Sequence, residues 1–445
     1  MNLQQDPSIE SKALTFHQVL ATWLPLVASW MLMSIELPTI NAIVARLSNP
    51  EINLAAYGGV VFPIALTIEA PVIMLLAAST ALSRDWESYQ RLKKYTLWMG
   101  GILMGLHLLV ALTPFYDFIV NVLLSSPKEI IEPARVSLLM LAPWTLSIAY
   151  RRFQQGAMIR FGHSRMVGET TFVRLVTVAV VLTVGMVVKT IPGALLAGLA
   201  QGLGVLLESI YAGVRIRKIH SEIKAAPSYE KPLTLKRFVS FYFPLAITSY
   251  LWLIWQPLIS GTVSRMPNPL ESLAVWSLVT GILFMFRSPG VAFKEAVVAL
   301  QKDAKSYMVL QRFACLFSLI TTVSAIVFVV SPLSRLWFTY VANLSTELVT
   351  VATFTLLFGI LLPFISMYIS LFQGIIVNQE KTSLIPEAVL VCLVSMGVVL
   401  AFGLITKAYK GVYIASAAFT TAHLTQCLWL FIRSRNQRKE LVNNS

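Results

Sequence analysis

Residues 35–55 read IELPTINAIVARLSNPEINLA, and a second version of this stretch, IWQPLISGTVSRMPNPLESLA, stands 219 positions later at residues 254–274. The offset also holds upstream, and it holds downstream with a one-residue slip, where ALSRDWESY (81–89) matches ALQKDAKSY (299–307). One offset over so many segments indicates a unit of about 220 residues that was duplicated and fused in parallel. Nine positions of the two quoted stretches are identical: Ile35 and Ile254, Pro38 and Pro257, Ile40 and Ile259, Val44 and Val263, Arg46 and Arg265, Asn49 and Asn268, Pro50 and Pro269, Leu54 and Leu273, and Ala55 and Ala274.

The composition restricts the class of protein. Of the 445 residues 56% are hydrophobic and only 13% are charged, and the mean hydropathy is +0.72. Such a chain cannot cover itself with polar surface, so we expect an all-α polytopic membrane protein. Its three cysteines lie in apolar runs and its histidines are scattered, which predicts no metal site and no cofactor. The sequence contains no Walker A, GxSxG, HExxH or CxxC motif, so we predict that the chain is not an enzyme.

Apolar runs predict twelve membrane-spanning helices in two pseudo-symmetric six-helix lobes. Residues 1–217 are predicted to form the N-lobe, residues 237–445 the C-lobe, and the polar residues 218–236 a cytoplasmic linker. The Asn-Pro turns at 49–50 and 268–269 are predicted to be short outer hairpins. The predicted spans are residues 17–46, 52–82, 95–123, 134–160, 166–190, 192–217, 236–265, 271–300, 310–340, 347–378, 383–406 and 411–434.

The net charge of +14 falls mainly on one side of these spans. On the side of both termini we count 24 Lys and Arg, with Arg151 and Arg152 among them, against 8 on the opposite side. The positive-inside rule therefore predicts cytoplasmic termini in an inner or plasma membrane. This distribution accounts for the charge, so we expect no nucleic-acid partner. We also expect a monomer surrounded by membrane lipid. Arg174, which lies near Glu169, and Glu208 are interpreted as structural polar ties.

Prolines inside the spans predict where the helices bend. Pro38, Pro71, Pro257 and Pro289 lie in spans 1, 2, 7 and 8. Each removes a backbone donor and frees a carbonyl, which is tolerated at membrane depth only where other groups or water satisfy it. We therefore expect these four prolines to act as kinks or hinges around a water-filled path.

Carboxylates inside the spans are candidates for ion coupling or substrate binding, since each costs roughly 2.5–3.5 kcal/mol at mid-depth without a partner or water. Glu36 precedes the Pro38 kink, and its counterpart in the second copy is Trp255. It is either a proton or cation site, or part of the substrate site, or a carboxylate that holds its helix at a solvated mouth. Glu69 stands where the second copy has Arg287, so the two charges either form a gate across a central cleft or pair within their own lobes.

Span 8 carries a cationic stripe. Arg287 and Lys294 are seven residues apart, which places them within about 20° of one helix face and about 10 Å apart along the axis. Glu295 is turned away by about 100° and is free to pair with a neighbouring helix, as a further candidate for ion coupling. The stripe predicts an anionic substrate; the alternative is an entrance at which both cations reach the membrane interface.

Two fused six-span bundles, the kinked spans 1 and 7 and the segment FQQGAMIRFGHSRMVGE (153–169) resemble the multidrug/oligosaccharidyl-lipid/polysaccharide flippase (MOP) superfamily, which includes the multidrug and toxic-compound extrusion (MATE) proteins. Within it the chain is most similar to the progressive ankylosis protein family, in residues 36–59, in residues 241–265 and in SPGVAFKE (288–295). The resemblance implies a V-shaped pair of lobes, with spans 1, 2, 7 and 8 around a central cavity and alternating access by lobe rocking. It also implies release of small anions such as pyrophosphate, citrate or nucleotide.

These observations predict a secondary active transporter that exports a small organic or phosphorylated anion, coupled to a proton or a sodium ion. Two other transport functions stay open, a cation-coupled multidrug exporter and a flippase for a lipid-linked saccharide. A membrane scaffold is the non-transport alternative, although the buried charges would then cost stability without a role.

Overall fold

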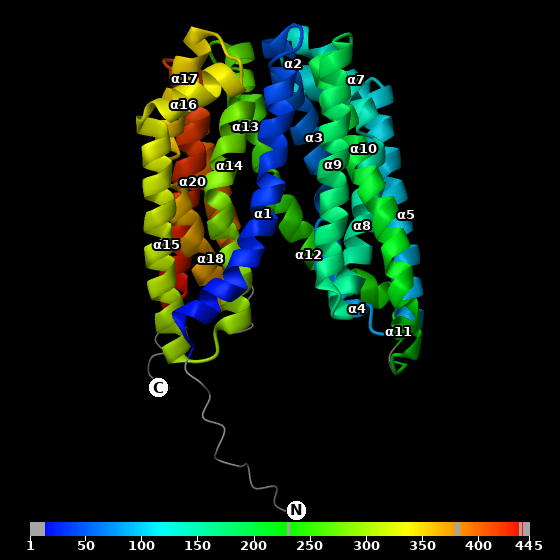
Figure 1. Ribbon diagram of the computed structural model, residues 1–445. Helices are drawn as coiled ribbons and strands as arrows, with labels where there is room; N and C mark the ends of the chain where they lie inside the picture. Colours follow the sequence, from blue (N-terminus) through cyan, green and yellow to red (C-terminus); the bar gives the residue numbers. More distant parts are fainter. Residues whose placement is uncertain (1–13, 229–231, 379–382, 436–437, 439–445) are drawn as a thin grey trace, which may run out of the picture.

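The structure is a computed structural model that describes residues 14–228, 232–378, 383–435 and 438. Over these residues every regular element is a helix (Figure 1). In the first half the helices are α1 (Phe16–Val44), α2 (Pro50–Ala56), η1 (Tyr57–Val61), α3 (Phe62–Glu69), η2 (Ala70–Val72), α4 (Leu75–Leu82), α5 (Trp86–Leu112), α6 (Phe115–Phe118), η3 (Ile119–Leu123), α7 (Lys128–Met140), α8 (Pro143–Arg160), α9 (Ser164–Val188), α10 (Gly193–Arg215), η4 (Ile216–Ile219) and α11 (His220–Ala225). In the second half they are α12 (Leu235–Leu253), α13 (Trp255–Val263), α14 (Pro269–Leu300), α15 (Ala304–Val330), α16 (Pro332–Leu336), η5 (Trp337–Val341), α17 (Thr346–Phe358), α18 (Leu362–Asn378), α19 (Leu384–Thr406) and α20 (Gly411–Arg433).

Ten helical segments of the described chain are long and apolar enough to cross a membrane. Two further segments, α7–α8 and α20, complete the predicted set of twelve, and both carry buried polar side chains within their length. Gln155 lies in α8, and His423 and Gln426 lie in α20. The prediction of an all-α polytopic membrane fold is confirmed.

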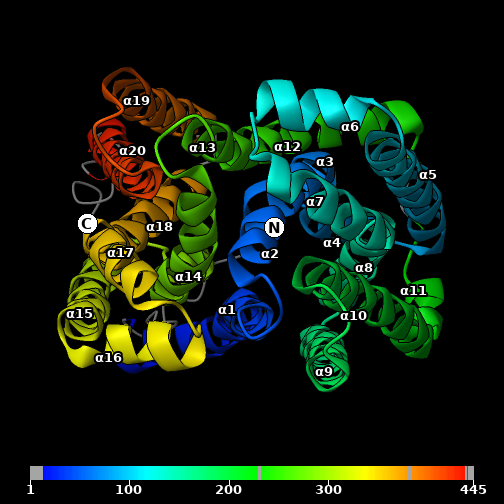
Figure 2. The same cartoon turned by 90° about the horizontal axis from the view of Figure 1, so that it is seen from above.

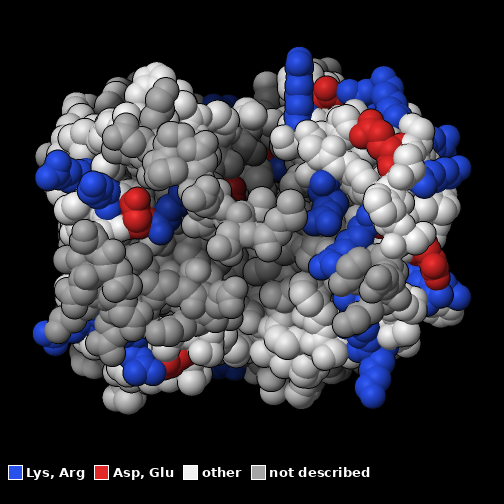
Figure 3. Space-filling model, turned by 90° about the horizontal axis from the view of Figure 1, so that it is seen from below, with Lys and Arg blue, Asp and Glu red and all other residues white. Residues whose placement is uncertain are grey.

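The helices form two bundles, and Figures 1 and 2 show them meeting at one face and separating toward the other. We call the face with the α1–α2 and α13–α14 turns the outer face, and the face where α1 begins and α20 ends the inner face. Seen from the inner face, the molecule is hollowed between the bundles and Lys and Arg side chains gather at its surface (Figure 3). Both described chain ends lie at the inner face; that this face is cytoplasmic stays a prediction.

The predicted third and ninth spans were misplaced along the chain. The helices α5 and α15 begin earlier than predicted, because Asp85 and Asp303 cap them. Each aspartate accepts a hydrogen bond from the backbone N–H three residues on, that of Ser88 and that of Ser306, and each serine hydroxyl closes the capping box. The two helices also end earlier, and the remaining predicted residues form α6–η3 and α16–η5 at the outer face.

The first helix of each half is bonded to the other half. Trp23 on α1 lies in an apolar cluster with side chains of α14 and α15, and its Nε1 donates to the Pro289 carbonyl at 3.0 Å. Tyr242 on α12, 219 positions after Trp23, donates its hydroxyl to the Pro71 carbonyl of η2. The division of the chain at residues 217 and 237 stays a prediction.

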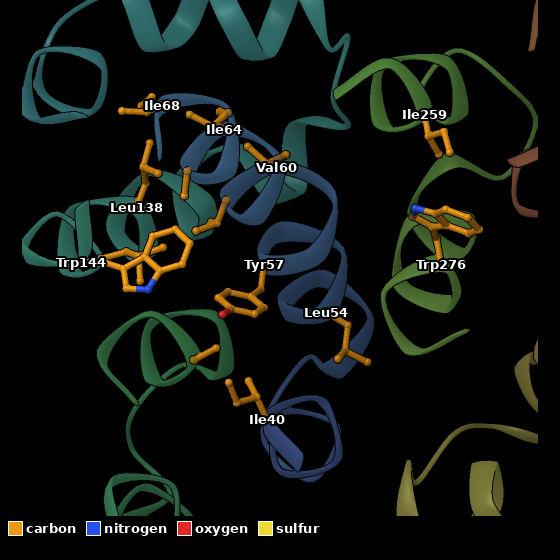
Figure 4. Close-up of a cluster of buried hydrophobic side chains, with 14 of the residues drawn as sticks. Ile40, Leu54, Tyr57, Val60, Ile64, Ile68, Leu138, Trp144, Ile259 and Trp276 are labelled. Carbon is orange, nitrogen blue, oxygen red and sulfur yellow. The ribbon is translucent and has the colours of Figure 1, made fainter. Parts of the chain in front are cut away.

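A continuous apolar core fixes the first bundle around the broken second span. Figure 4 shows Leu54, Tyr57 and Val60 on successive turns of this span, with the Tyr57 ring on the side of Trp144; Leu138 belongs to the same cluster. All five side chains are at least 97% shielded from solvent. The α2–η1 part of this span also packs against α14 of the other bundle.

At the outer face the two bundles are in close contact. Asn49 and Asn268 have φ of 50° and 53°, and each is followed by the proline that opens the next span, so the two predicted Asn-Pro hairpins are confirmed. Gly58 packs so closely on α14 that a Cβ at this position would lie 2.3 Å from the Ser277 side chain. Asn41 on α1 donates to the Ser277 carbonyl at 3.0 Å. The outer ends are therefore closed in this conformation.

Candidate functional site

Five helices of the first half bring six charged side chains into one buried region. Three are acids and three are arginines, so the region is formally neutral. We call this set the charge cluster: Glu36 on α1, Glu69 on α3, Arg151 and Arg152 on α8, Arg174 on α9 and Glu208 on α10.

Glu36 is a paired carboxylate. The Nη2 atom of Arg174 lies 3.0 Å from its Oε2, and each side chain is only 7% exposed. The second oxygen, Oε1, has no hydrogen-bond partner among the described residues. Arg174, which we interpreted as a structural polar tie near Glu169 in the sequence, has Glu36 and Glu208 as its ion-pair partners, whereas Glu169 pairs with Arg215 on α10.

Glu208 ties three helices together, as the sequence suggested. Its side chain is fully buried, and Arg151 lies 3.0 Å from it. Gln155 donates to the same carboxylate at 3.3 Å, and Arg174 Nε lies 3.8 Å away. Arg151 and Arg152 were wrongly counted among the cytoplasmic-side cations, because α8 continues through both and Arg151 is buried.

Glu69 and Arg152 are the least satisfied members of the charge cluster. Glu69 lies at the end of α3, is 3% exposed, and its Oε2 has no hydrogen-bond partner among the described residues. Among nearby cations, Arg152 exerts the largest electrostatic effect on Glu69. The Nε of Arg152 is also buried without a partner in the described chain. Both groups therefore keep hydrogen-bonding capacity for a ligand, a proton or water.

Arg287 lies in the second bundle, half-buried on α14. Its Nε donates to the Ser366 hydroxyl of α18 at 3.0 Å, and its guanidinium lies 4.9 Å from the centre of the Phe419 ring of α20. No carboxylate among the described residues forms an ion pair with it. The hypothesised contact between Glu69 and Arg287 is thus not made in this conformation.

Lys294 and Glu295 follow on the inner half of α14, and both side chains are exposed. The polar groups that interact with the Glu295 carboxylate are the Trp30 side chain of α1, Lys294, and Arg152 of the other bundle. At this level the first bundle contributes Arg152, and the second bundle contributes both Lys294 and Glu295. The roles of these residues in substrate binding or ion coupling stay predictions.

The four predicted kink prolines are of two kinds. Pro71 lies in η2 and Pro257 follows the break between α12 and α13, so both mark interruptions of a span. Pro38 and Pro289 lie inside the continuous helices α1 and α14. The carbonyl that Pro289 frees, that of Met285, accepts a hydrogen bond from the adjacent serine hydroxyl at 2.9 Å. Whether the four positions act as hinges stays a prediction.

Four contributing residues were missed by the sequence reasoning: Arg152, Ser366, Phe419 and Trp30. Arg152 could have been found, because the helical pattern of residues 143–160 runs through it without a break. The other three are ordinary residues of apolar spans, and only the packing of distant helices gives them a role. No local pattern marks them.

A sequence profile of the progressive ankylosis protein family matches residues 90–269. A comparison with the sequences of curated proteins finds no match. Among solved structures, the lipid II flippase MurJ in an inward closed conformation is similar, with 15% sequence identity, a TM-score of 0.71, and coverage of 94% of this chain and 90% of that chain. The chain has the fold of the MOP superfamily transporters.

Two MATE transporters are similar to the chain in the same way. An inward-facing multidrug resistance MATE family transporter has 15% identity and a TM-score of 0.60, and the match covers 95% of this chain and 99% of that chain. A mutant of the Vibrio cholerae MATE transporter VcmN has 14% identity and a TM-score of 0.62, with coverage of 95% and 99%. The resemblance to the MOP superfamily and to the progressive ankylosis protein family is confirmed, by the shared fold and by the profile match over residues 90–269.

Proposed function

We propose that this MOP-fold protein is a secondary active transporter that exports a small organic or phosphorylated anion by alternating access between its two bundles. The single observation that carries the proposal is Arg287. It is a half-buried guanidinium, held by a hydroxyl and an aromatic ring, with no carboxylate paired to it among the described residues. Such a cation is stabilised by a bound anion.

The charge cluster supports an anionic substrate over a cationic one. Its three carboxylates are balanced by three arginines, and two of the carboxylates form ion pairs within it. A site for cationic drugs would need uncompensated negative charge in the cleft. The excess charge instead lies at Arg287, which is positive, because Lys294 is balanced by the adjacent Glu295.

Coupling to a proton or a sodium ion fits Glu69 and Glu295 better than Glu36. Glu36 already shares its carboxylate with Arg174, so a cation would have to displace a guanidinium. Glu69 has a buried oxygen without a partner in the described chain. Glu295 lies on the exposed inner half of α14. Binding of a proton or a sodium ion at Glu69 or Glu295 would neutralise a negative charge near Arg152. It would thereby change the electrostatic potential at an anion bound between the bundles.

The test is flux into or out of proteoliposomes with radiolabelled citrate, pyrophosphate and ATP, and a cationic dye in parallel. Arg287→Gln removes a charge-assisted contact worth about 1.5–3 kcal/mol, so anion flux at subsaturating substrate should fall roughly tenfold to a hundredfold. Lys294→Gln should weaken the flux less, because Lys294 is exposed. Glu69→Gln should change how the anion flux depends on pH or on the sodium concentration.

Arg335→Gln is the matched control. Arg335 is an exposed cation on α16 at the outer face, and none of its described contacts is an ion pair. Its neutralisation should leave the flux unchanged. Transport of the dye without any anion would favour the multidrug alternative, and movement of a lipid-linked saccharide alone would favour a flippase. Anion flux that is indifferent to Arg287→Gln would contradict the proposed site.

A further inference from the structure

The outer face carries two arginines at matched positions of the duplicated unit. Arg46 follows the end of α1 and Arg265 follows the end of α13, 219 positions later. Both side chains are exposed, and neither forms an ion pair within the described residues. Both instead donate to backbone carbonyls of the opposite half.

Arg46 reaches from the first half to the second. Its Nη1 and Nη2 donate to the carbonyls of Val341 and Tyr340, in the single π-helical turn η5. Nη1 also donates to the Ala42 carbonyl of its own helix at 2.5 Å, which fixes the direction of the side chain. Asn343, just after η5, strengthens the same contact by donating to the Ala45 carbonyl at 3.2 Å.

Arg265 makes the reciprocal contact. Its Nη2 donates to the Val122 carbonyl in η3 of the first half at 2.7 Å. Its Nη1 donates to the Gly261 carbonyl of its own helix at 2.5 Å, just as Arg46 does. Val122 and Val341 are themselves 219 positions apart, so both copies of the unit build the same bond in opposite directions.

The chemistry of the three acceptor carbonyls explains why arginine suits this place. A carbonyl at the C-terminal end of a helical turn has no intrahelical partner and carries the negative end of the helix dipole. A guanidinium offers several donors in one plane, so it can bind such a carbonyl and its own helix at once. No carboxylate takes part, so the contact needs no titrating partner.

Both contacts join the two halves at the outer face, so neither can persist when the outer ends separate. We infer that Arg46 and Arg265 form a reciprocal clasp that holds the outer side closed, and that both must release their carbonyls before the outer side opens. The clasp is uneven: Arg46 reaches two carbonyls of the other half and Arg265 reaches one. Loss of Arg46 therefore favours opening more than loss of Arg265.

The test measures how often the outer side opens, without any substrate. Ser277 is 3% exposed and lies against Gly58 at the closed crossing of the bundles. Ser277→Cys, in a chain whose native Cys315, Cys392 and Cys427 are replaced by serine, should react slowly with a maleimide in lipid nanodiscs. Arg46→Gln should raise the labelling rate by more than about tenfold, because it removes two charge-assisted hydrogen bonds across the halves and the loss of one such bond corresponds to about tenfold. Arg265→Gln should raise it less, and the double variant should exceed both.

Arg335→Gln serves as the matched control and should leave the labelling rate at Ser277→Cys unchanged. A second reporter, Ser137→Cys, lies fully buried inside the first bundle and should stay unreactive in all variants. If Ser137→Cys reacts, the glutamine substitutions have loosened the fold. The double variant Arg46→Lys with Arg265→Lys is then measured instead, because lysine keeps the charge but cannot bind two diverging carbonyls. In that variant labelling should rise at Ser277→Cys and stay absent at Ser137→Cys. A double variant that labels at the control rate would overturn the clasp. This result is independent of the proposed anion, which the assay does not contain.

Discussion

Removal of either partner of the Glu36–Arg174 pair tests whether this pair stabilises the first bundle. The two side chains are each 7% exposed and lie 3.0 Å apart. Loss of one partner leaves the other as a buried charge, which typically costs about 3–5 kcal/mol. Loss of both removes the buried charges together, and the remaining charge cluster stays neutral.

The two single substitutions should lower the stability by different amounts, because Glu36 and Arg174 have different surroundings. After Glu36→Gln, Arg174 still has Glu208 at 3.8 Å, so the cost should lie near the lower end of that range, at about 3 kcal/mol. After Arg174→Gln, Glu36 loses its only ion pair in the described chain, and its Oε1 already lacks a partner. The cost should then approach about 5 kcal/mol. The double variant should regain most of the loss.

The assay is a denaturant titration of the purified protein in mixed micelles, with the four proteins of the double-mutant cycle measured side by side. Arg135→Gln is the control, because Arg135 forms a 2.6 Å pair with Asp117 in which both side chains are partly exposed. Such a pair contributes only about 0–1 kcal/mol. Equal stabilities for Glu36→Gln and the wild type, or simple additivity in the cycle, would refute the reasoning and return Glu36 to the role of a free ion site.

Three further outcomes follow from the fold. Gly156→Ala should cost about 1–3 kcal/mol, because its Cβ would lie 2.5 Å from the Leu76 carbonyl, whereas Gly101→Ala, with open space around it, should stabilise by up to about 1 kcal/mol in the same titration. Asn49→Cys and Asn268→Cys should both react with an impermeant reagent from outside the cell; reaction of only one would contradict the parallel duplication. Hydrogen bonds from Ser306 lower the pKa of the Asp303 carboxyl, so Asp303→Ala should cost about 1 kcal/mol at neutral pH, and that difference should disappear as the pH falls through this lowered pKa.

The sign of the last effect follows from the direction of the shift. A carboxyl with a folded-state pKa below its unfolded value of about 3.9 contributes stability at higher pH and loses it on protonation. Asp303→Asn should retain most of the wild-type stability, since asparagine also caps helices well. Because asparagine does not titrate, its capping contribution should stay constant as the pH falls, so the stability difference between Asp303→Asn and Asp303→Ala should not change with pH.

Much of the fold could be predicted from the sequence because the repeat and the apolar runs are local signals. The single offset predicted that Asn49 and Asn268 would turn the chain in the same way, and their φ angles agree within a few degrees. The start of α5 and of α15 was missed, because hydropathy alone set the boundaries. The capping residues Asp85 and Asp303 in the repeated segments were the signal that would have corrected both.

The site could be predicted only in part, since its geometry depends on helices far apart in the sequence. Glu36 stood out as a carboxylate in an apolar span, but its partner Arg174 lies on α9 and no spacing connects them. Arg151 and Arg152 were assigned to the membrane surface because a pair of arginines near the end of an apolar run usually lies there. Buried carboxylates on other helices hold them within the bundle instead.

The two halves share the hydrogen bonds that connect them but differ in their buried charged residues. Trp23 and Tyr242 are different residues, yet each donates to the carbonyl of the proline in the other half's second span. Arg46 and Arg265 likewise repeat one contact in both directions. The charge cluster has no such counterpart: Glu36 is matched by Trp255, and Glu69 by Arg287. The contacts between the halves are thus symmetric, whereas the charges inside them are not. The buried charges of the first half balance one another, and the second half carries Arg287 without an ion-pair partner among the described residues. This asymmetry is the reason why we propose that the anion binds at Arg287.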